Sequence, residues 1–429
     1  MFGDSIAHEW DEENSAGGVI VVVGCGLRKY REYLLSAAGN RNRIWLFNSE
    51  EPTWQCEYVE GTTVVDVHDR PAVLAAAKDL AGHTRVLGVL SWDETLIVTV
   101  AHVAEQLGLP GAGVDGIEGC RDKGRNRRLL TGAGLPQPRF AQVSSADEAV
   151  DAAASIGYPV VVKPRGMGAS IGVVLAGDEG ELRSAFDVAQ DSSYIGAVPY
   201  RGGALVEEYL TGPEISVDAA VVAGEYLPLF VARKNVGMFP YFEELGHTID
   251  AADPLMADEE LLAVLSGAHR AIDFGYGVTH TEVKLTARGP MIIEINGRLG
   301  GDMIPYLGKL ATGIDPGVVV ADVAAGRGPD LARTEHRTVG IRFGYPPEDC
   351  EVVSVSTPDA AACEGLLAAV PLAEPGTVLR LPPGGYISRH SYVICAAESR
   401  VECEKRLDEI AALVRLEWRS LAEDAVPVA

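Results

Sequence analysis

The sequence predicts a multidomain protein of mixed α/β and α+β class, with a doubly wound parallel sheet in its N-terminal part. Three observations carry this prediction. The chain has 429 residues, enough for about three domains of average size. Residues 19–115 alternate apolar, strand-like runs with helical segments, which is the pattern of a parallel sheet covered by helices. From residue 158 onward, apolar runs come in pairs around turns, as in antiparallel sheets.

The N-terminal part contains four apolar runs of strand length. The predicted strands are 19–23, 43–48, 63–67 and 85–90, and the predicted helices are 27–38, 71–80 and 94–108. The turn Gly24-Cys25-Gly26 resembles the start of a dinucleotide-binding fingerprint, but Lys29 stands where that fingerprint needs its third glycine. We therefore interpret it as a plain turn at the carboxyl edge of the sheet.

The net charge of −25 disfavours a nucleic-acid partner, because phosphate contacts need clustered lysine and arginine. It also disfavours docking on an anionic membrane, although a local basic pocket can still hold a small anion. No run approaches the ~20 apolar residues of a membrane span, and the acidic residues 1–18 resemble a flexible tail. With seven cysteines and no CxxC pair, we expect reduced thiols and a cytoplasmic location.

Basic residues gather between positions 116 and 136 of this acidic chain. Asp122 and Lys123 start a helix there, and cations at such a place can face phosphate. Arg127 and Arg128 fit the ordinary interpretation of a basic helix face in solvent.

A second basic position stands beside a glycine-rich loop. The strand 160–162 ends at Lys163, and a loop then leads into another short strand at 173–175. This hairpin lacks the Walker pattern, but free N–H groups in such a loop can surround phosphate, with the lysine as a point charge. A purely structural turn is the more common explanation for a hairpin of this kind.

Extended backbone lies between two strands at 204–222. The first strand runs into Glu207 and Glu208, and Glu214 begins the second strand after a Gly-Pro turn. Exposed backbone N–H and C=O groups suit the edge of an adenine ring, and the carboxylate can accept hydrogen bonds from ribose hydroxyls. A simple connection between strands is the alternative.

The strongest local pattern is a pair of strands at 279–302. Glu282 lies in the first strand, and Glu294 and Asn296 share one face of the second. Two carboxylates and an amide oxygen are suitable ligands for Mg²⁺. Glu294 is flanked by isoleucines, so it needs a partner or a metal if it points inward. Arg298 follows, where it can contact a phosphate or a developing oxyanion.

The order of these motifs resembles the ATP-grasp superfamily of carboxylate–amine ligases, and the likeness covers about residues 19–345. Residues 346–429, with a predicted amphipathic helix at 401–418, resemble less specifically the C-terminal domain of the biotin-carboxylase-like branch. The resemblance implies four parts, which are a flexible tail (1–18), a substrate-facing α/β domain (19–115), an ATP-grasp core (116–345) with a glycine-rich lid subdomain at about 145–207, and a small α+β domain (346–429).

The resemblance also implies roles for individual residues. The predicted ATP-binding residues are Lys123 and Lys163 on the phosphates, Lys234 nearer the γ-phosphate, Met167, Gly168 and Ser170 in the loop, Glu207, Glu208, Tyr209 and Leu210 at the adenine, and Glu214 at the ribose. The predicted ligands of Mg²⁺, for which Mn²⁺ is a possible substitute, are Glu282, Glu294 and Asn296, and Arg298 is the predicted catalytic arginine.

The segment Glu244-Leu-Gly-His247 resembles one that lies over the substrate pocket of L-amino acid and dipeptide ligases. Glu244 can hold a substrate ammonium, and His247 can do so or accept a proton; a loop histidine that caps backbone groups is the alternative. Glu94 resembles a first-domain glutamate facing the same pocket, although a glutamate at a helix N-terminus also suits the helix dipole. Gly300 and Gly301 are expected to shape the site of the substrate carboxylate.

These features predict an ATP-dependent ligase that activates an amino-acid-like carboxylate as an acyl phosphate. The amine of a second amino acid or peptide then attacks, with Arg298 and a backbone N–H near Ser170 expected to stabilise the oxyanion. The alternatives are a carboxylase-like or purine-biosynthetic enzyme that uses bicarbonate, a non-catalytic nucleotide-binding protein, and a dehydrogenase that uses residues 24–26. A homodimer is left open.

Overall fold

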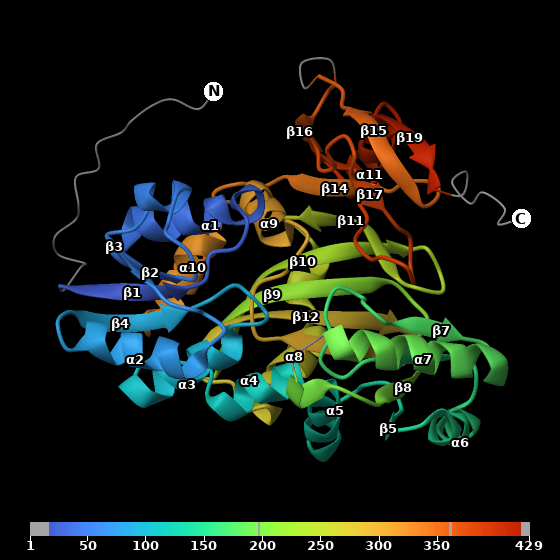
Figure 1. Cartoon of the computed structure of the whole chain (residues 1–429), viewed down its shortest axis with the longest axis horizontal. Coiled ribbons are helices and arrows are strands. Elements are labelled where there is room, and N and C mark those ends of the chain that lie inside the picture. Colours follow the sequence, from blue (N-terminus) through green and yellow to red (C-terminus); the bar gives the residue numbers. More distant parts are fainter. Residues whose placement is uncertain (1–16, 196–197, 360–362, 422–429) are drawn as a thin grey trace, which may run out of the picture.

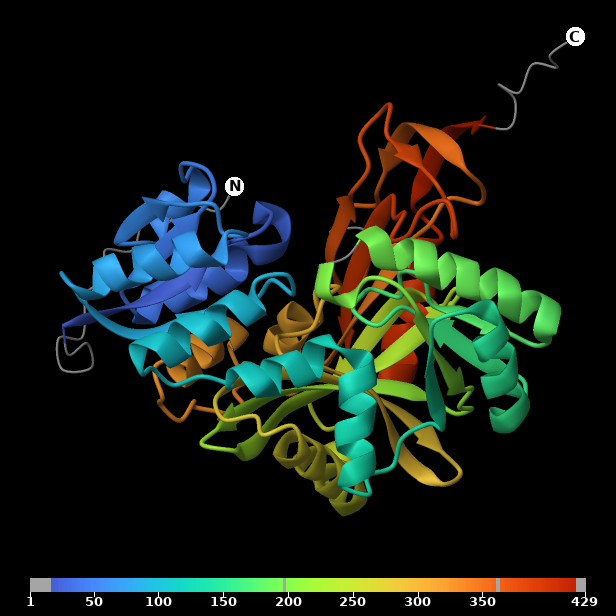
Figure 2. The same cartoon turned by 60° about the horizontal axis from the view of Figure 1, so that its bottom comes forward.

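The computed structural model describes residues 17–195, 198–359 and 363–421. Figures 1 and 2 show a blue N-terminal lobe, a central sheet, a green lobe beside that sheet, and an orange-to-red C-terminal lobe. The tail predicted for residues 1–18 lies outside the described residues except for its last two, of which Gly18 begins the first strand. Among the described residues, no helix has both the length and the apolar character needed to cross a membrane.

The N-terminal lobe confirms the predicted doubly wound parallel sheet. Its strand order is β3-β2-β1-β4, with all neighbours parallel. Side chains of β1 alternate between two cores, since Ile20 and Val22 face α1 and α10 whereas Val19 and Val21 face α2 and α3. The elements are β1 (Gly18–Val23), α1 (Arg28–Arg41), β2 (Ile44–Asn48), β3 (Gly61–Val64), α2 (Arg70–Ala81), β4 (Arg85–Leu90), α3 (Ile97–Leu107) and, later in the chain, α10 (Pro316–Ala324).

An eight-stranded antiparallel sheet forms the centre of the molecule, in the order β13-β12-β9-β10-β11-β14-β18-β16. Its strands are β9 (Glu214–Val222), β10 (Glu225–Gly237), β11 (Glu243–Asp250), β12 (Gly277–Thr286), β13 (Gly289–Asn296), β14 (Thr338–Gly344), β16 (Leu366–Pro371) and β18 (Ser391–Ala397). The last two strands in this order come from beyond residue 345, so the sheet continues across the domain boundary predicted there.

Helices cover both faces of the central sheet. Ile292 and Ile295 of β13 pack against α4, α5 and α8, whereas Phe230 and Ile249 share a core with α9 and α10. These helices are α4 (Val114–Arg121), α5 (Lys123–Gly132), α8 (Glu259–Ala271) and α9 (Ile304–Thr312).

The green lobe is a small four-stranded sheet with a core of its own. Its order is β5-β8-β6-β7, and Val160, Val162, Leu182 and Phe186 belong to a buried cluster separate from the main core. Its elements are β5 (Phe140–Val143), α6 (Ala146–Ile156), β6 (Val160–Lys163), β7 (Val174–Ala176), α7 (Glu179–Ile195) and β8 (Ala204–Glu208). The predicted strand–loop–strand around Lys163 is therefore the antiparallel pair β6–β7.

The C-terminal lobe corrects one prediction. The helix expected at 401–418 ends early, because α11 spans Arg400–Ala411 and β19 spans Arg415–Ser420. Leu416 and Trp418 alternate with charged residues, which is a strand period, and β19 pairs with β15 (Cys350–Ser356). Strand β17 (Val378–Leu379) completes this three-stranded sheet.

The N-terminal lobe packs closely on the core at Gly88 of β4. A Cβ atom there would lie 2.1 Å from the carbonyl oxygen of Ala324 in α10. We expect Gly88→Ala to lower the free energy of unfolding by about 1–3 kcal/mol, because a strand or helix backbone must move. Chemical denaturation checks this, with Gly328→Ala as the control, since a Cβ atom at Gly328 meets nothing within 4 Å. Equal stability of the two variants would contradict the prediction.

Candidate active site

One cleft between the central sheet and the green lobe collects almost all the predicted site residues. Its volume is about 1170 Å³, including the space at its mouth that is open to solvent. The predicted residues that line it are Lys123, Lys163, Met167, Gly168, Ser170, Glu207, Glu208, Tyr209, Leu210, Glu214, Lys234, Glu244, Glu282, Glu294, Asn296, Arg298 and Gly301. The three others, Glu94, His247 and Gly300, lie directly behind this lining, as described below.

Apolar side chains form part of the same cleft. Val161 and Val173 flank the glycine-rich loop, and Leu210, Phe242 and Ile293 lie on the other walls. Apolar walls beside an extended segment at Tyr209 are suited to a flat heteroaromatic ring, whose edge can bond to the backbone.

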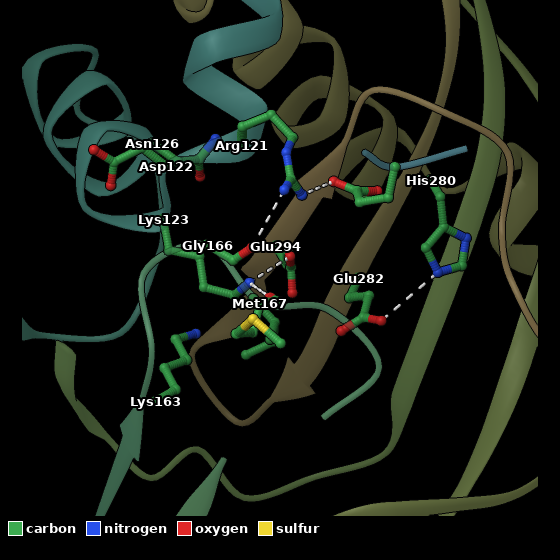
Figure 3. Close-up of polar contacts among 12 residues, drawn as sticks. Arg121, Asp122, Lys123, Asn126, Lys163, Gly166, Met167, His280, Glu282 and Glu294 are labelled. Atoms are coloured by element: carbon green, nitrogen blue, oxygen red, sulfur yellow. Dashed lines mark hydrogen bonds and ion pairs between the residues drawn. The ribbon is translucent and has the colours of Figure 1, made fainter. Parts of the chain in front are cut away.

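Lys123 connects the glycine-rich loop to the predicted metal ligands. Its Nζ lies 2.8 Å from Oε1 of Glu294 and also donates to the carbonyl of Met167, as Figure 3 shows. Asp122 caps α5 by accepting from the N–H of Gly124 at 2.9 Å, which orients the start of this helix toward the cleft.

Lys163 belongs to a buried cluster of charged side chains that also contains Arg127 and Glu207. Arg127 is only 1% exposed, donates to both oxygens of Glu207 at 2.8 and 3.1 Å, and donates to two carbonyls of β13. The expectation that Arg127 lies in solvent is therefore wrong, whereas Arg128 is exposed. Arg127 follows Lys123 by four positions on α5, a spacing that puts both on one helix face and could have revealed it.

Glu207 is shared between two cations. Lys163 Nζ lies 2.7 Å from the same oxygen, Oε2, that accepts from Arg127. Burial alone would raise the pKa of Glu207, but Arg127 and Lys163 lower it to about 2. Burial lowers the pKa of Lys163, because Glu207 offsets only part of its desolvation and Arg127 is a nearby cation. A phosphate would supply the missing negative charge.

The predicted metal ligands lie on directly paired strand positions. Glu282 of β12 is opposite Glu294 of β13, and His280 is opposite Asn296. Each carboxylate already holds a cation, since Lys234 Nζ lies 2.8 Å from Glu282 Oε1 and Lys123 holds Glu294. Two carboxylates and an amide oxygen on one wall of the cleft fit a hard divalent cation such as Mg²⁺.

Lys234 is surrounded by carboxylates. Its Nζ lies 3.0 Å from Glu214 and 2.8 Å from Glu244, besides the contact with Glu282. Burial alone would lower the pKa of Lys234, but these carboxylates raise it well above its usual value. Lys284, which pairs with Glu214 at 2.9 Å, also lines the cleft. It shares the face of Glu282, as the two-residue period of a strand predicts.

A buried histidine beside the predicted metal ligands was not predicted. His280 Nδ1 lies 2.6 Å from Asp218 Oδ1, and the other oxygen of Asp218 accepts from the N–H of Gly300 at 3.0 Å. Burial alone would lower the pKa of His280, but Asp218 raises it to about 9. The alternation of positions 280 and 282 in one strand is the sequence signal that could have found it.

Behind the lining of the cleft, His247 lies between two carboxylates. Its Nε2 is 2.9 Å from Glu244 and 3.5 Å from Asp302. Burial alone would lower the pKa of His247, but these carboxylates raise it. Arg389 holds both oxygens of Asp302 at 2.6 and 2.8 Å and stacks 3.7 Å from the ring centroid of Phe343. Arg389 comes from the C-terminal part, and nothing in the sequence pattern connects it to this site.

The side chains of Glu244, His247 and Asp302 are close enough together to hold a metal ion. However, Lys234 already contacts Glu244 and Arg389 contacts Asp302, so two cations balance the carboxylates. This charge balance disfavours a divalent cation there. Each carboxylate can accept more than one hydrogen bond, so a small donor such as an ammonium still fits.

Arg298 is held from the N-terminal lobe. Its Nε lies 2.5 Å from Glu94 Oε2, and the other oxygen of Glu94 contacts Arg121. Burial alone would raise the pKa of Glu94, but Arg298 and Arg121 lower it to about 2. Both oxygens of Glu94 thus contact arginines; its predicted role in substrate binding stays a prediction.

Backbone strain gathers around the cleft. Ala169 and Ser170 in the glycine-rich loop, and Asp302 and Met303 after Arg298, have φ values of 56°, 56°, 52° and 63°. Residues other than glycine rarely adopt these positive φ values. Those that do cluster at functional sites.

Comparison with known proteins agrees with this geometry. The model of the ATP-grasp domain matches residues 156–306, and that of the ATP-grasp N-terminal domain matches residues 44–111. This chain carries an ATP-grasp domain. The matched region contains the glycine-rich loop, Glu282, Glu294, Asn296 and Arg298.

Relatives of this ATP-grasp chain include ligases. Alanine–anticapsin ligase of Bacillus subtilis (strain 168) is 30% identical over an alignment of 262 residues, and the match covers 56% of this chain and about half (54%) of that protein. The crystal structure of the L-amino acid ligase from Bacillus licheniformis has a TM-score of 0.77 at 21% identity and covers 94% of this chain and 99% of that one.

A more distant structural neighbour is the biotin carboxylase domain dimer of Hydrogenobacter thermophilus 2-oxoglutarate carboxylase, solved with MgADP and bicarbonate. Its TM-score is 0.68 at 16% identity, and the match covers 94% of this chain and 91% of that one. These structural matches confirm the mixed α/β multidomain fold.

Arg127 and Arg128 offer a matched test of the buried charge cluster. We expect Arg127→Met to lower the free energy of unfolding by about 3–5 kcal/mol, because it leaves Glu207 buried with less charge compensation. Arg128→Met, whose exposed guanidinium bonds Gln142 at 3.0 Å, should change it by less than about 0.5 kcal/mol. Denaturant titration at neutral pH measures both values.

The stabilisation from the ion pair between Arg127 and Glu207 depends on pH. The Glu207 pKa falls from 4.5 to about 2 on folding, so its stabilisation is complete above about pH 4.5 and disappears as the pH falls through about 2. The stability difference between wild type and Arg127→Met should therefore shrink as the pH falls across this window. A difference that stays constant down to the lowest pH would contradict the assignment.

Proposed function

We propose that the protein is an ATP-dependent carboxylate–amine ligase that joins two amino-acid-like substrates. The supporting observation is that one cleft combines lysines beside a glycine-rich loop with a cluster of two carboxylates and a histidine. Lys123 and Lys163 line the cleft together with that loop, and Glu244 and Asp302 line it with His247 directly behind them. The ligase names of the relatives support the same reaction class.

In this proposal ATP is the phosphoryl donor, with adenine against Val161, Leu210 and Ile293 and ribose near Glu214. Glu282, Glu294 and Asn296 would hold Mg²⁺, with Mn²⁺ as a substitute. The metal neutralises charge on the phosphates when it is bound.

Each further step is assigned to a group of this chain. Glu244 and His247 orient the first amino acid by its ammonium, so that its carboxylate faces Arg298 and the γ-phosphate. Lys163 and Arg298 balance the charge that spreads over the transferring phosphoryl group. The amine of the second substrate then attacks the acyl phosphate, and Arg298 with a backbone N–H near Ser170 stabilises the oxyanion. The amine also loses one proton, for which Glu244 and the neutral form of His247 are the candidate acceptors.

Bicarbonate is the competing first substrate, because the fold resembles a biotin carboxylase domain. The cluster of Glu244, His247 and Asp302 favours an amino acid instead, because an ammonium offers several hydrogen-bond donors to the two carboxylates. Bicarbonate offers a single O–H donor.

Release of ADP in the presence of pairs of amino acids, with mass detection of the products, tests the proposal. We expect ADP release that depends on amino acids, together with a product lighter by one water than the sum of the pair. ADP release that needs only bicarbonate, or no ATP turnover under any pairing, would overturn it. The assay does not depend on where the protein is located in the cell, and the cytoplasmic location stays a prediction.

Arg298→Ala separates binding from chemistry. We expect ATP affinity to change little, because the lysines and the adenine wall remain, whereas product formation falls by about a hundredfold or more. Isothermal titration with a non-hydrolysable ATP analogue and the product assay measure the two effects. Arg337→Ala is the control, since Arg337 is not among the residues that line the cleft and pairs with Glu335 at 2.7 Å. Near-native product formation by Arg298→Ala would contradict the role of Arg298.

A further inference from the structure

The junction of α4 and α5 holds the glycine-rich loop through three consecutive residues. Arg121 Nη2 donates to the carbonyl of Gly166 at 3.4 Å, Asp122 accepts from the side chain of Arg165 at 2.5 Å, and the N–H of Lys123 donates to the carbonyl of Arg165 at 3.0 Å. Figure 3 shows Arg121 above the loop, with its guanidinium directed down toward Gly166. Asp122 caps a helix and Lys123 is assigned above to the phosphates of ATP, so Arg121 is the one of these three without an assigned task.

The opposite side of the Arg121 guanidinium faces the N-terminal lobe. Its Nη1 contacts Oε1 of Glu94, and Oε2 of Glu94 lies 2.5 Å from Nε of Arg298. Glu94 follows β4 in the N-terminal lobe, whereas Arg298 follows β13 of the central sheet. A continuous chain of polar contacts therefore runs from the loop at Gly166 through Arg121 and Glu94 to Arg298.

Packing holds Arg121 in the orientation that this chain needs. The side chain is 8% exposed, and its guanidinium carbon lies 5.5 Å from the ring centroid of Tyr200 in the green lobe. Tyr200 is held in turn, because its hydroxyl donates to Glu118 at 2.8 Å. A planar guanidinium can donate in two directions at once, whereas a lysine at the same position is a single point charge.

We propose that Arg121 is a positioning residue that couples the glycine-rich loop to Arg298 through Glu94. The proposal rests on the ligase function above. When Arg121 bridges Gly166 and Glu94, the loop lies over the cleft while Glu94 holds Arg298 in place. Without the bridge, the loop and Arg298 adopt their positions independently.

The consequence is a change in the fate of the acyl phosphate. Attack by the amine forms the amide C–N bond and expels phosphate, and the amine gives up one proton. Attack by water regenerates the carboxylic acid and also expels phosphate, so the ATP is spent without product. Both routes release one ADP for each ATP, and only the first makes the amide. A loop that is not coupled to Arg298 admits water, which favours the second route.

The test is the amount of product formed for each ADP released by the full chain. We expect the ratio to be close to one for wild type and to fall roughly tenfold for Arg121→Met, the effect of losing one hydrogen bond to a charged group. Arg125→Met is the matched control, because Arg125 is near in sequence but pairs with the exposed Asp115 at 2.7 Å. Its ratio should equal that of wild type.

Two further variants make the result decisive. Glu94→Gln should lower the ratio as Arg121→Met does, and the double variant should lower it no further, because both act through one chain of contacts. If Arg121→Met does not fold, Arg121→Lys keeps the charge but cannot bridge both partners, and it should also lower the ratio.

A loss of rate with an unchanged product-to-ADP ratio in the Arg121 variants would overturn the coupling role, since a merely structural defect slows both routes equally. Wild-type protein that releases ADP but condenses no amino acids would instead overturn the ligase function. The two failures are therefore distinguishable in one set of assays.

Discussion

Every cation that lines the cleft is paired with a carboxylate, and the rest of the site depends on this pairing. Lys123 pairs with Glu294, Lys163 with Glu207, and Lys234 with three glutamates. Unpaired charges in so buried a place would be costly, whereas paired ones can remain ionised. ATP and a divalent cation bring both signs of charge together. In the proposed complex, the phosphates can replace the carboxylates as partners of the lysines, and the metal can replace the lysines as the partner of Glu282 and Glu294.

This pairing also explains how a chain with a net charge of −25 can offer a site for a polyanion. Lys123, Lys163 and Lys234 line the cleft in spite of the surplus of acids, and each of them lies against a carboxylate. Local charge order within the cleft, rather than total charge, determines which ligand group can lie where.

The protein backbone supplies the geometry through strand register and through contacts between lobes. Glu282 and Glu294 face one another because β12 and β13 pair at those positions. Arg389 reaches Asp302 because β18 continues the central sheet past the predicted boundary at residue 345. The active-site cleft is thus assembled by the central sheet, the green lobe, the N-terminal lobe and the C-terminal part together.

Much of this could be predicted from local patterns in the sequence. The parallel N-terminal sheet, the hairpin around Lys163 and the alternation of Glu282, Glu294 and Asn296 each follow from a period of two or from apolar runs between turns. The helix predicted at 401–418 was wrong in its second half, since its apolar positions also fit a strand and only pairing with β15 decides between the two. Short segments depend on their partners in this way.

The sequence by itself predicted most of the residues that line the cleft, because residue type and spacing within one strand or loop are local properties. Only the tertiary structure decided how the charges are paired. Arg127 became a buried partner of Glu207, Glu94 came to lie between Arg121 and Arg298, and Arg389 was brought to Asp302 from the other end of the chain. Such contacts join residues that are far apart in the sequence, and their ion pairs depend on burial and distance in three dimensions, which no local pattern encodes.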